Sequence, residues 1–334
     1  MSTLARPLDR NLALELVRAT EAAAMAAARW MGRGDKQAVD QAAVDAMRNV
    51  LQTVDMDGVV VIGEGEKDQA PMLYIGERIG NGSPPPVDVA VDPVDGTGLT
   101  ANGLPGAISV VALAERGSLF VTRLAYMEKI VVGPRARGAI HLDAPVAENL
   151  EAVALALDRE VRDLTVVVLN RPRNARLIEE VRAAGARIRL IQDGDVAAGI
   201  LAAMEDSSGV DLLMGIGGAP EGVVTACAVK CLGGDIQGRL WAKDERDRAQ
   251  AEQEGIDLGR VLTLEDLCSG ENVFVAATGV TDGELLDGVR YFSNGAITQS
   301  LVMRSASGTV RWIDARHDFT RLRKLAGSRY EGPS

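Results

Sequence analysis

Residues 164–233 alternate three times between a short run typical of a β-strand and a longer run typical of a helix. The strand runs are LTVVVLN, RIRLIQ and VDLLMGIG, and the helical runs that follow them are ARLIEEVRAAG, VAAGILAAM and EGVVTACAVKCLG. Strands that alternate with helices form a parallel sheet, because each helix returns the chain to the start of the next strand. Open parallel sheets bind ligands beyond the carboxyl ends of their strands. The pattern therefore predicts an α/β unit with a binding site at three strand ends.

Three polar turns follow these strands. The turn Arg171–Arg173 (RPR) is basic and could bind a phosphate bidentately, and the turn Asp193–Asp195 (DGD) could accept hydrogen bonds from sugar hydroxyls. The run GIGGAPE at residues 215–221 is a glycine-rich turn at a helix start, which suits an anion. It is not a dinucleotide fingerprint, because Pro220 replaces the third glycine. Any one of these turns alone would be an ordinary connection between a strand and a helix, whereas the three together favour a binding site.

The stretch VDVAVDPVDGTGLT, residues 87–100, reads as a buried strand that ends in carboxylates. Its alternate valines predict the strand, and we expect Asp92-Pro93 to end it, because proline cannot donate to a strand ladder. Asp95-Gly96-Thr97 follows as a tight turn. Two carboxylates at a fixed strand end suit Mg²⁺ or Mn²⁺. The alternative is a purely structural turn, since Asp-Pro and Asp-Gly pairs are common in turns.

Two further carboxylates extend this candidate site. A helix is predicted from Lys36, and Asp40 continues its apolar stripe. A carboxylate near a helix start is favoured by the helix dipole, but one on the buried face needs a partner, for which a metal is one candidate. Glu64 directly follows the short strand GVVVIG, so it stands at a strand end as Asp92 does. The charged run after that strand could equally be a solvated loop.

An oxygen-only cluster of carboxylates is the ligand set for paired Mg²⁺ or Mn²⁺ ions, which clamp both oxygens of an in-line phosphoryl displacement. A metal-activated water would attack, Thr97 could position it, and Asp40 could relay its proton. The two histidines, His141 and His317, suggest no Ser-His-Asp arrangement, so we do not expect a serine nucleophile. The candidate metal ligands are Asp40, Glu64, Asp92, Asp95 and Glu221.

Length and charge set the remaining expectations. The 334 residues suggest two domains. We expect an α+β domain with an antiparallel or mixed sheet at residues 1–145 and an α/β domain with a parallel sheet at residues 146–330. A formal charge of −11 argues against a nucleic-acid partner. We find no signal peptide and no run near the roughly 20 apolar residues that span a bilayer, so we expect a cytoplasmic protein without a membrane partner.

The three cysteines do not suggest a disulfide framework. Cys227 and Cys231 are four residues apart in a helical pattern, and we interpret them as core residues. Cys268 stands alone in the sequence.

Several motifs together resemble a known family. The run DPVDGT at residues 92–97 resembles the DPxDGT signature of the lithium-sensitive, metal-dependent sugar phosphatase superfamily. The neighbouring motifs resemble class II (GlpX-type) fructose-1,6-bisphosphatases, and the resemblance runs from about residue 12 to residue 318. These motifs are WMGRGDK (30–36), VIGEGEKDQAPMLYIGE (61–77), RPR (171–173), DGDVAAGI (193–200), GIGGAPEGV (215–223) and SGENVFVAATGVTDGELLDGVRYF (269–292).

The resemblance implies a layered α/β/α/β/α sandwich that works as a homo-oligomer, either a tetramer or a dimer. It implies hydrolysis of the 1-phosphate of fructose 1,6-bisphosphate to fructose 6-phosphate, a gluconeogenic step, with two or more Mg²⁺ or Mn²⁺ ions at the site. Alternatives that keep the chemistry are a dual enzyme that also takes sedoheptulose 1,7-bisphosphate and an inositol-monophosphatase-like enzyme. A non-catalytic binder of sugar phosphates is a further alternative, against which the intact Thr97 argues.

Site residues carry over from the family motifs by position. The implied metal ligands are the five acids named above, although the second acid of DPxDGT can be Glu in the family and is the shorter Asp95 here. The implied catalytic residues are Thr97, Asp40 and Lys36. The implied substrate contacts are Asp95, Gly96, Thr97, Tyr126, Arg171, Pro172, Arg173, Asp193, Gly194, Asp195 and Gly218.

Overall fold

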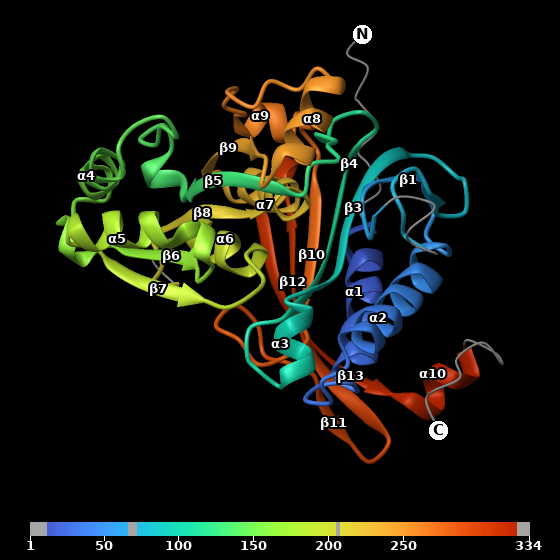
Figure 1. Ribbon diagram of the computed structural model, residues 1–334. Helices are drawn as coiled ribbons and strands as arrows, with labels where there is room; N and C mark the ends of the chain where they lie inside the picture. Colours follow the sequence, from blue (N-terminus) through green and yellow to red (C-terminus); the bar gives the residue numbers. More distant parts are fainter. Residues whose placement is uncertain (1–11, 66–71, 205–207, 326–334) are drawn as a thin grey trace, which may run out of the picture.

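The computed structural model describes residues 12–65, 72–204 and 208–325 and contains two β-sheets (Figure 1). The first sheet has eight strands in the order β11-β12-β10-β4-β3-β1-β2, with β13 paired to β12 off this path. β1 and β3 pair in parallel, and the other neighbours pair antiparallel, so this sheet is mixed. Its strands are β1 (Asp57–Ile62), β2 (Arg78–Ile79), β3 (Pro86–Asp95), β4 (Ile108–Glu115), β10 (Phe274–Gly279), β11 (Arg290–Phe292), β12 (Gly295–Arg304) and β13 (Thr309–Asp318).

The second sheet has five strands in the order β7-β6-β8-β5-β9. The predicted parallel arrangement is confirmed for β7, β6 and β8, whereas β5 pairs antiparallel with both β8 and β9. The sheet as a whole is therefore mixed. Its strands are β5 (Tyr126–Val132), β6 (Thr165–Leu169), β7 (Arg187–Ile191), β8 (Leu212–Gly218) and β9 (Asp235–Trp241).

The helices and sheets form five layers, which pack together through three buried clusters of side chains. One cluster packs α1 (Leu12–Ala28) and α2 (Lys36–Leu51) on the outer face of the first sheet. The central cluster packs α6 (Val196–Ala203) and α7 (Ala219–Leu232) between the two sheets. The third packs α4 (Val146–Leu157) and α5 (Ala175–Ala183) on the far face of the second sheet. This order confirms the predicted α/β/α/β/α sandwich (Figure 1).

The first helical layer forms as its sequence predicts. α1 reads LALELVRATEAAAMAAA, and its many alanines let it lie close against the sheet while leaving little side chain exposed. Asp35 caps the start of α2, where its side chain accepts a hydrogen bond from the amide of Ala38 at 3.0 Å. The helix predicted from Lys36 is confirmed, and it contains Asp40.

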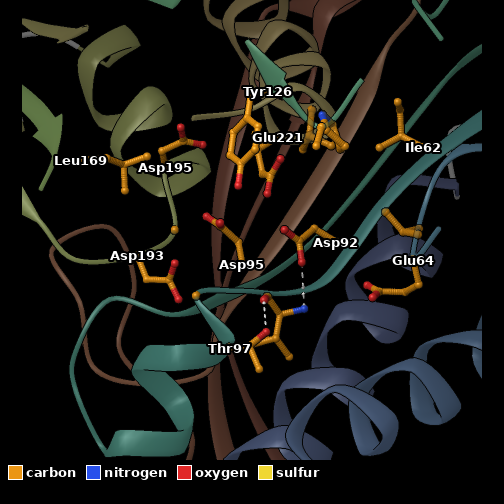
Figure 2. Close-up of a pocket in the computed structure, with 18 of the residues that line it drawn as sticks. Ile62, Glu64, Asp92, Asp95, Thr97, Tyr126, Leu169, Asp193, Asp195 and Glu221 are labelled. Atoms are coloured by element: carbon orange, nitrogen blue, oxygen red, sulfur yellow. Dashed lines mark hydrogen bonds between the residues drawn. The ribbon is translucent and has the colours of Figure 1, made fainter. Parts of the chain in front are cut away.

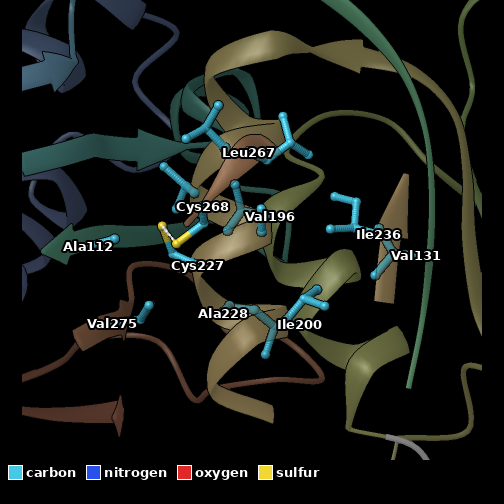
Figure 3. Close-up of a cluster of buried hydrophobic side chains, with 14 of the residues drawn as sticks. Ala112, Val131, Val196, Ile200, Cys227, Ala228, Ile236, Leu267, Cys268 and Val275 are labelled. Carbon is cyan, nitrogen blue, oxygen red and sulfur yellow. Dashed lines mark hydrogen bonds between the residues drawn. The ribbon is translucent and has the colours of Figure 1, made fainter. Parts of the chain in front are cut away.

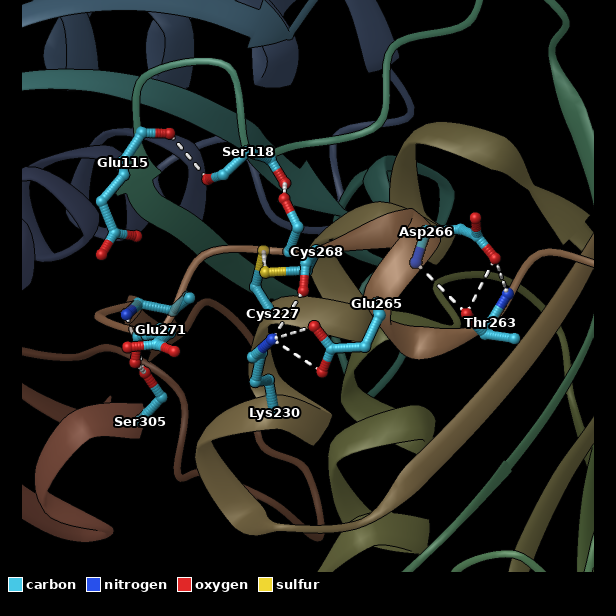
Figure 4. A network of polar contacts seen from close by, with 12 residues as sticks. Glu115, Ser118, Cys227, Lys230, Thr263, Glu265, Asp266, Cys268, Glu271 and Ser305 are labelled. Atoms are coloured by element: carbon cyan, nitrogen blue, oxygen red, sulfur yellow. Dashed lines mark hydrogen bonds and ion pairs between the residues drawn. The ribbon is translucent and has the colours of Figure 1, made fainter.

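α7 is buried on nearly all sides because it lies between the sheets. Cys227 and Cys231 are buried in this layer, as predicted, and the Sγ atom of Cys227 lies 3.8 Å from that of Cys268 (Figure 3). Lys230, nearer the end of the helix, binds Glu265 and the carbonyl of Cys268 (Figure 4). Packing along its length fixes the helix, and with it the position of Glu221 in its first turn.

The remaining helices are short or lie at the surface. They are α3 (Thr97–Asn102), α8 (Glu245–Gln253), α9 (Leu264–Leu267) and α10 (Phe319–Leu325). The charge-dense run at residues 243–255 contains a mostly exposed helix, α8, with Asp244 as its cap. No helix in the described part of the chain is both long enough and apolar enough to cross a bilayer.

β5 belongs to the second sheet although its residues precede the predicted domain boundary. The strand begins at Tyr126, and the earlier Leu119 makes an isolated bridge with Cys268. Conversely, β10 to β13 follow the predicted domain boundary in the sequence but belong to the first sheet. Hydrogen bonding between strands that lie far apart in the sequence decides which sheet each strand joins, and local patterns do not encode it. The division at residues 145 and 146 stays a prediction.

Candidate active site

A cavity of about 700 Å³ is lined by residues from both sheets (Figure 2). It collects nearly all the residues that the sequence motifs single out, although these come from seven separate segments. Lys36 and Pro172 are the two predicted residues that do not line it. The predicted residues that do are Asp40, Glu64, Asp92, Asp95, Gly96, Thr97, Tyr126, Arg171, Arg173, Asp193, Gly194, Asp195, Gly218 and Glu221.

The end of β3 brings Asp92 and Asp95 to this cavity. The prediction that Asp92-Pro93 ends the strand is wrong, because β3 continues to Asp95. The register against β4 shifts between these two aspartates, so Pro93 sits in an irregular step where its missing N–H costs no regular ladder bond. Asp92 Oδ1 accepts from the amide of Val94 at 3.1 Å. Asp95 Oδ2 accepts from the amide of Val196 at 3.0 Å, which ties the strand end to α6.

Thr97 follows at the first position of α3. Gly96 precedes it with a φ of 90°, a left-handed conformation that glycine adopts without strain and that ends the strand abruptly. The Oγ1 of Thr97 lies 2.6 Å from Asp40 Oδ1 and 3.1 Å from the carbonyl oxygen of Val94. The hydroxyl has one proton, and the short contact indicates donation to the Asp40 carboxylate. Its lone pairs are therefore available to a donor in the cavity.

Glu64 is held by the loop that follows β1. Its amide donates to the carbonyl of Leu73 at 3.0 Å. Leu73 is fully buried and has a φ of 54°, which is uncommon for a residue with a branched side chain. The Glu77 carboxylate fixes this conformation by accepting from the Leu73 amide, and it also accepts from Arg48 Nε at 2.6 Å. Arg48 and Glu77 thus support the Glu64 backbone from outside the cavity.

The basic side of the cavity comes from the turn after β6. Arg173 donates from Nε to the carbonyl of Ile216 at 2.9 Å, and its guanidinium carbon lies 4.7 Å from the centre of the Tyr126 ring. Tyr126 in turn packs edge-on against Trp241, its partner across β5 and β9, with ring centroids 5.9 Å apart. A stacked guanidinium keeps its planar donors free for an anion. Pro172 starts the short 3₁₀ helix behind this turn.

Asp193 joins the two sides of the cavity. Its Oδ1 accepts from Arg171 at 3.1 Å, and its Oδ2 accepts from the amide of Gly98 at 3.2 Å. A Cβ on Gly98 would lie 2.7 Å from Asp193 Oδ2 and 3.3 Å from Lys36 Nζ. Lys36 therefore lies beside the cavity, next to the start of α3, rather than on its lining.

The glycines of GIGGAPE leave room for carboxylates. A Cβ on Gly217 would lie 1.9 Å from Asp195 Oδ2, and one on Gly218 would lie 1.6 Å from Glu221 Oε2. Both glycines are therefore required by close approach of acidic side chains. Glu221 occupies the first turn of α7, so the turn supports acidic side chains, and its role as an anion site stays a prediction.

Burial raises the pKa of every candidate metal ligand. The pKa of Glu64 rises from 4.5 to about 7, first through burial and then through repulsion by Asp40 and Glu221. Burial also raises the pKa values of Asp92 and Asp95 well above the ordinary value, with repulsion from neighbouring acids adding to it. The pKa values of Asp40 and Glu221 rise in the same direction, again chiefly through burial. A cluster of acids with raised pKa values lacks the positive charge that would stabilise its carboxylates.

The donor set fits hard divalent cations. All five candidate ligands offer oxygen, the donor that Mg²⁺ and Mn²⁺ prefer. Glu221 Oε2 and Asp195 Oδ1 are buried without a hydrogen-bond partner among the described residues, as expected of oxygens that await a ligand. Within residues 12–65, 72–204 and 208–325, no three acidic, His or Cys side chains already surround one point at metal-ligand spacing.

Sequence reasoning missed Lys129, Trp241, Arg48 and Glu77. Lys129 is 1% exposed and lies under the cavity, with Nζ 2.8 Å from Asp195 Oδ2. The sequence feature that could have revealed it is a single lysine inside the mostly apolar strand YMEKIVV. Trp241, Arg48 and Glu77 carry no comparable signal, because each acts through a neighbour that only the fold supplies.

We expect Mn²⁺ to raise the melting temperature more at pH 8 than at pH 6. In the metal-free protein, Glu64 has a folded pKa of about 7, above its unfolded value of 4.5. An acid shifted in this direction favours folding below pH 4.5, and that stability is lost as the pH rises to 7, by about 3 kcal/mol for this group. A bound cation offsets the loss, and protons compete with it less at pH 8.

Scanning calorimetry with and without Mn²⁺ at the two pH values measures this difference. The variant Glu64→Gln should show a smaller difference between pH 6 and pH 8, because the titrating group is gone. Equal metal-induced shifts at both pH values would contradict the prediction.

Comparison with known proteins shows the family of this chain. The model of a family described as bacterial fructose-1,6-bisphosphatase, glpX-encoded, matches residues 10–317. The chain is 46% identical over 335 aligned positions to the D-fructose 1,6-bisphosphatase class 2/sedoheptulose 1,7-bisphosphatase of Synechococcus sp. (strain JA-3-3Ab). It is 47% identical over 323 positions to fructose-1,6-bisphosphatase 1 class 2 of Escherichia coli (strain K12). Each alignment covers 93% of this chain and 96% of the relative. The resemblance seen in the motifs is therefore confirmed, and the chain belongs to the glpX-encoded family of bacterial fructose-1,6-bisphosphatases.

Proposed function

We propose that this chain hydrolyses the 1-phosphate of fructose 1,6-bisphosphate and releases fructose 6-phosphate and phosphate. The observation that carries the proposal is one cavity with a buried carboxylate cluster on one side and two arginines on the other. The acids would hold two or more Mg²⁺ or Mn²⁺ ions, which when bound neutralise phosphate oxygens and activate water. The ligands would be Asp40, Glu64, Asp92, Asp95 and Glu221.

Thr97 and Asp40 would handle the attacking water. The Thr97 hydroxyl donates to Asp40, so its oxygen can accept a hydrogen bond from water and hold it in line with the phosphorus atom. Asp40 would receive the proton through the hydroxyl, which already donates to its carboxylate. Lys36 would add positive charge beside Asp193 without touching the cavity.

The remainder of the substrate would lie toward the second sheet. Arg171 and Arg173 would bind the 6-phosphate, since guanidinium groups match phosphate oxygens in pairs. Asp193 and Asp195 would accept hydrogen bonds from sugar hydroxyls, and Tyr126 would close the pocket beside Arg173. Gly96, Pro172, Gly194 and Gly218 would contribute backbone shape rather than side chains.

Phosphate release from fructose 1,6-bisphosphate, with and without EDTA, tests the activity. We expect release that requires Mn²⁺ or Mg²⁺ and stops when the chelator is added. No release at any concentration of either metal would refute the proposal and favour a protein that only binds sugar phosphates.

A second substrate deserves the same assay. The Synechococcus relative is described as acting on sedoheptulose 1,7-bisphosphate as well, and the cavity of about 700 Å³ supports a sugar one carbon longer. Phosphate release from fructose 1,6-bisphosphate, sedoheptulose 1,7-bisphosphate and inositol monophosphate, compared side by side, distinguishes the three candidate substrate specificities. We expect inositol monophosphate to be the poorest substrate, because it has no second phosphate for the arginines.

Arg173→Ala should raise the KM for fructose 1,6-bisphosphate about tenfold to a hundredfold, since it removes hydrogen bonds to a charged group. We expect kcat to change much less, because Arg173 lies away from the carboxylate cluster. The matched control is Arg176→Ala, which removes an exposed arginine bound to Glu180. Steady-state kinetics measure both variants, and an unchanged KM for Arg173→Ala would remove this residue from the second phosphate site.

We also propose that the chain works in the cytoplasm as a homo-oligomer, a tetramer or a dimer. β13 is an edge strand that pairs only with β12 among the described strands, and its Trp312 is 51% exposed. Such an edge is usually covered in the working protein. The free thiols support a reducing compartment. Light scattering measures the molecular mass, and a monomer at micromolar concentration would contradict the oligomer.

A further inference from the structure

Lys129 is a buried cation beneath the cavity that no predicted role explains. Its side chain is 1% exposed and lies in the middle of β5, a strand with otherwise apolar inward side chains. Its Nζ lies 2.8 Å from Asp195 Oδ2 and donates to the carbonyl of Gly218 at 3.0 Å. Burying a charge to this degree is costly unless its partners compensate. The contacts with Asp195 and Gly218 therefore compensate for the burial of the lysine.

The neighbouring strands leave space for this lysine. β5 lies between β8 and β9, and the residues directly opposite Lys129 on these strands are Gly215 and Gly238. A Cβ on Gly217 would lie 3.1 Å from Lys129 Cε and closer still to Asp195. A larger residue at position 217 would push the lysine or the aspartate out of place, whereas a Cβ on Gly215 would meet Asn174 and Leu177 and one on Gly238 would meet Met127. Gly217 therefore leaves the space in which the ion pair fits.

The pair leaves one oxygen of Asp195 unused. Asp195 is 3% exposed and lines the cavity, and Lys129 binds its Oδ2. Its Oδ1 is buried and has no hydrogen-bond partner among the described residues. A buried acceptor without a donor is unfavourable, so a donor from a ligand would be bound strongly here. Asp195 also lies close to the carboxylates of Asp95 and Glu221, which repel it.

We propose that Lys129 is a positioning residue for sugar recognition. It holds Asp195 by Oδ2 and presents Oδ1 to a hydroxyl of the bound sugar, and it ties this carboxylate to the Gly218 turn rather than to the candidate metal ligands. This inference rests on the proposed function, in which the cavity binds a sugar phosphate. It assigns the lysine an effect on the sugar and none on a free phosphate ion.

Lys129→Met tests the inference, because methionine keeps most of the length and removes the charge. Binding is measured by calorimetry in the presence of Mn²⁺, with fructose 6-phosphate and inorganic phosphate as the two probes. We expect the Kd for fructose 6-phosphate to rise at least tenfold and the Kd for inorganic phosphate to change less than threefold. In kinetics, KM for the bisphosphate should rise by more than kcat falls.

Asp195→Asn and the double variant Lys129→Met/Asp195→Asn complete a cycle. If the lysine acts only through Asp195, the double variant binds fructose 6-phosphate no more weakly than Asp195→Asn alone. The double variant also avoids an unpaired buried charge, so it keeps the test available even where Lys129→Met fails to fold. Lys230→Met is the control, since Lys230 pairs with the exposed Glu265 outside the cavity, and both Kd values should stay unchanged.

Three results would overturn the inference: wild-type affinity of Lys129→Met for fructose 6-phosphate, an equal loss of affinity for both probes, or a double variant clearly weaker than Asp195→Asn. The proposed function fails in a different way. Wild-type protein that neither binds fructose 6-phosphate nor releases phosphate refutes both, whereas wild-type protein that binds and turns over leaves the comparison with Lys129→Met decisive.

Discussion

Replacing Asp92 by asparagine should lower turnover of fructose 1,6-bisphosphate by about a thousandfold or more, which corresponds to about 4 kcal/mol of barrier. Asp92 stands at the end of β3 among Asp95, Glu221 and Glu64, the acids that we propose as metal ligands. Asparagine keeps the acceptor that binds the Val94 amide but removes the negative charge. The backbone should therefore stay in place while the affinity for the cation falls.

The same substitution should leave the metal-free protein at least as stable as the wild type. Burial and neighbouring acids raise the pKa of Asp92 well above its ordinary value, so the charged form is unfavourable when no cation is present. Thermal unfolding in EDTA at pH 8 measures this effect, and circular dichroism checks the fold. Asp45→Asn on α2 is the control, because Asp45 pairs with Gln41 at the surface and does not line the cavity. A near-normal rate for Asp92→Asn would exclude it as a metal ligand.

Replacing Thr97 by valine should lower kcat about a hundredfold to a thousandfold, in the range found for groups that move or orient a proton in the transition state. Valine has nearly the same shape but cannot donate to Asp40 or accept from water. KM should change little, since the proposed role concerns the attacking water and not the sugar. Thr97→Ser keeps the hydroxyl and should recover most of the rate.

Thr100 provides a matched control in the same helix. It is fully buried in α3, and its Oγ1 has no hydrogen-bond partner in the described part of the chain. Thr100→Val should therefore leave kcat unchanged and stabilise the fold or leave it unaffected, because no hydrogen bond is lost. Equal losses in Thr97→Val and Thr100→Val would show that α3 is merely sensitive to substitution, and the role of Thr97 would be withdrawn.

The sequence indicated much of the site because its acids follow regular elements. Glu64 follows an apolar strand, Asp92 lies near the carboxyl end of another, and Asp40 lies on the stripe of a helix, so local patterns place each of them near a strand end or facing the core. The three turns after β6, β7 and β8 meet at one edge because these strands are parallel. Each inference needed only the period of an element and the direction of its strand.

Other features depended on contacts between distant segments. β3 runs past Pro93 because β4 pairs with it on both sides of an irregular step, which no pattern within residues 87–100 reveals. The role of Glu77 depends on Arg48 and on the unusual backbone of Leu73. Each of these is a tertiary effect that overrides local preference.

The placement of β5 and β10 has a consequence for synthesis on the ribosome. β4 finds its partner β10 about 160 residues later, and β5 waits for β8 and β9. Neither sheet can close while the nascent chain is half made, so the exposed edge of β4 depends on protection until the last quarter of the chain has emerged. Truncated chains that stop before Phe274 should therefore engage chaperones or aggregate.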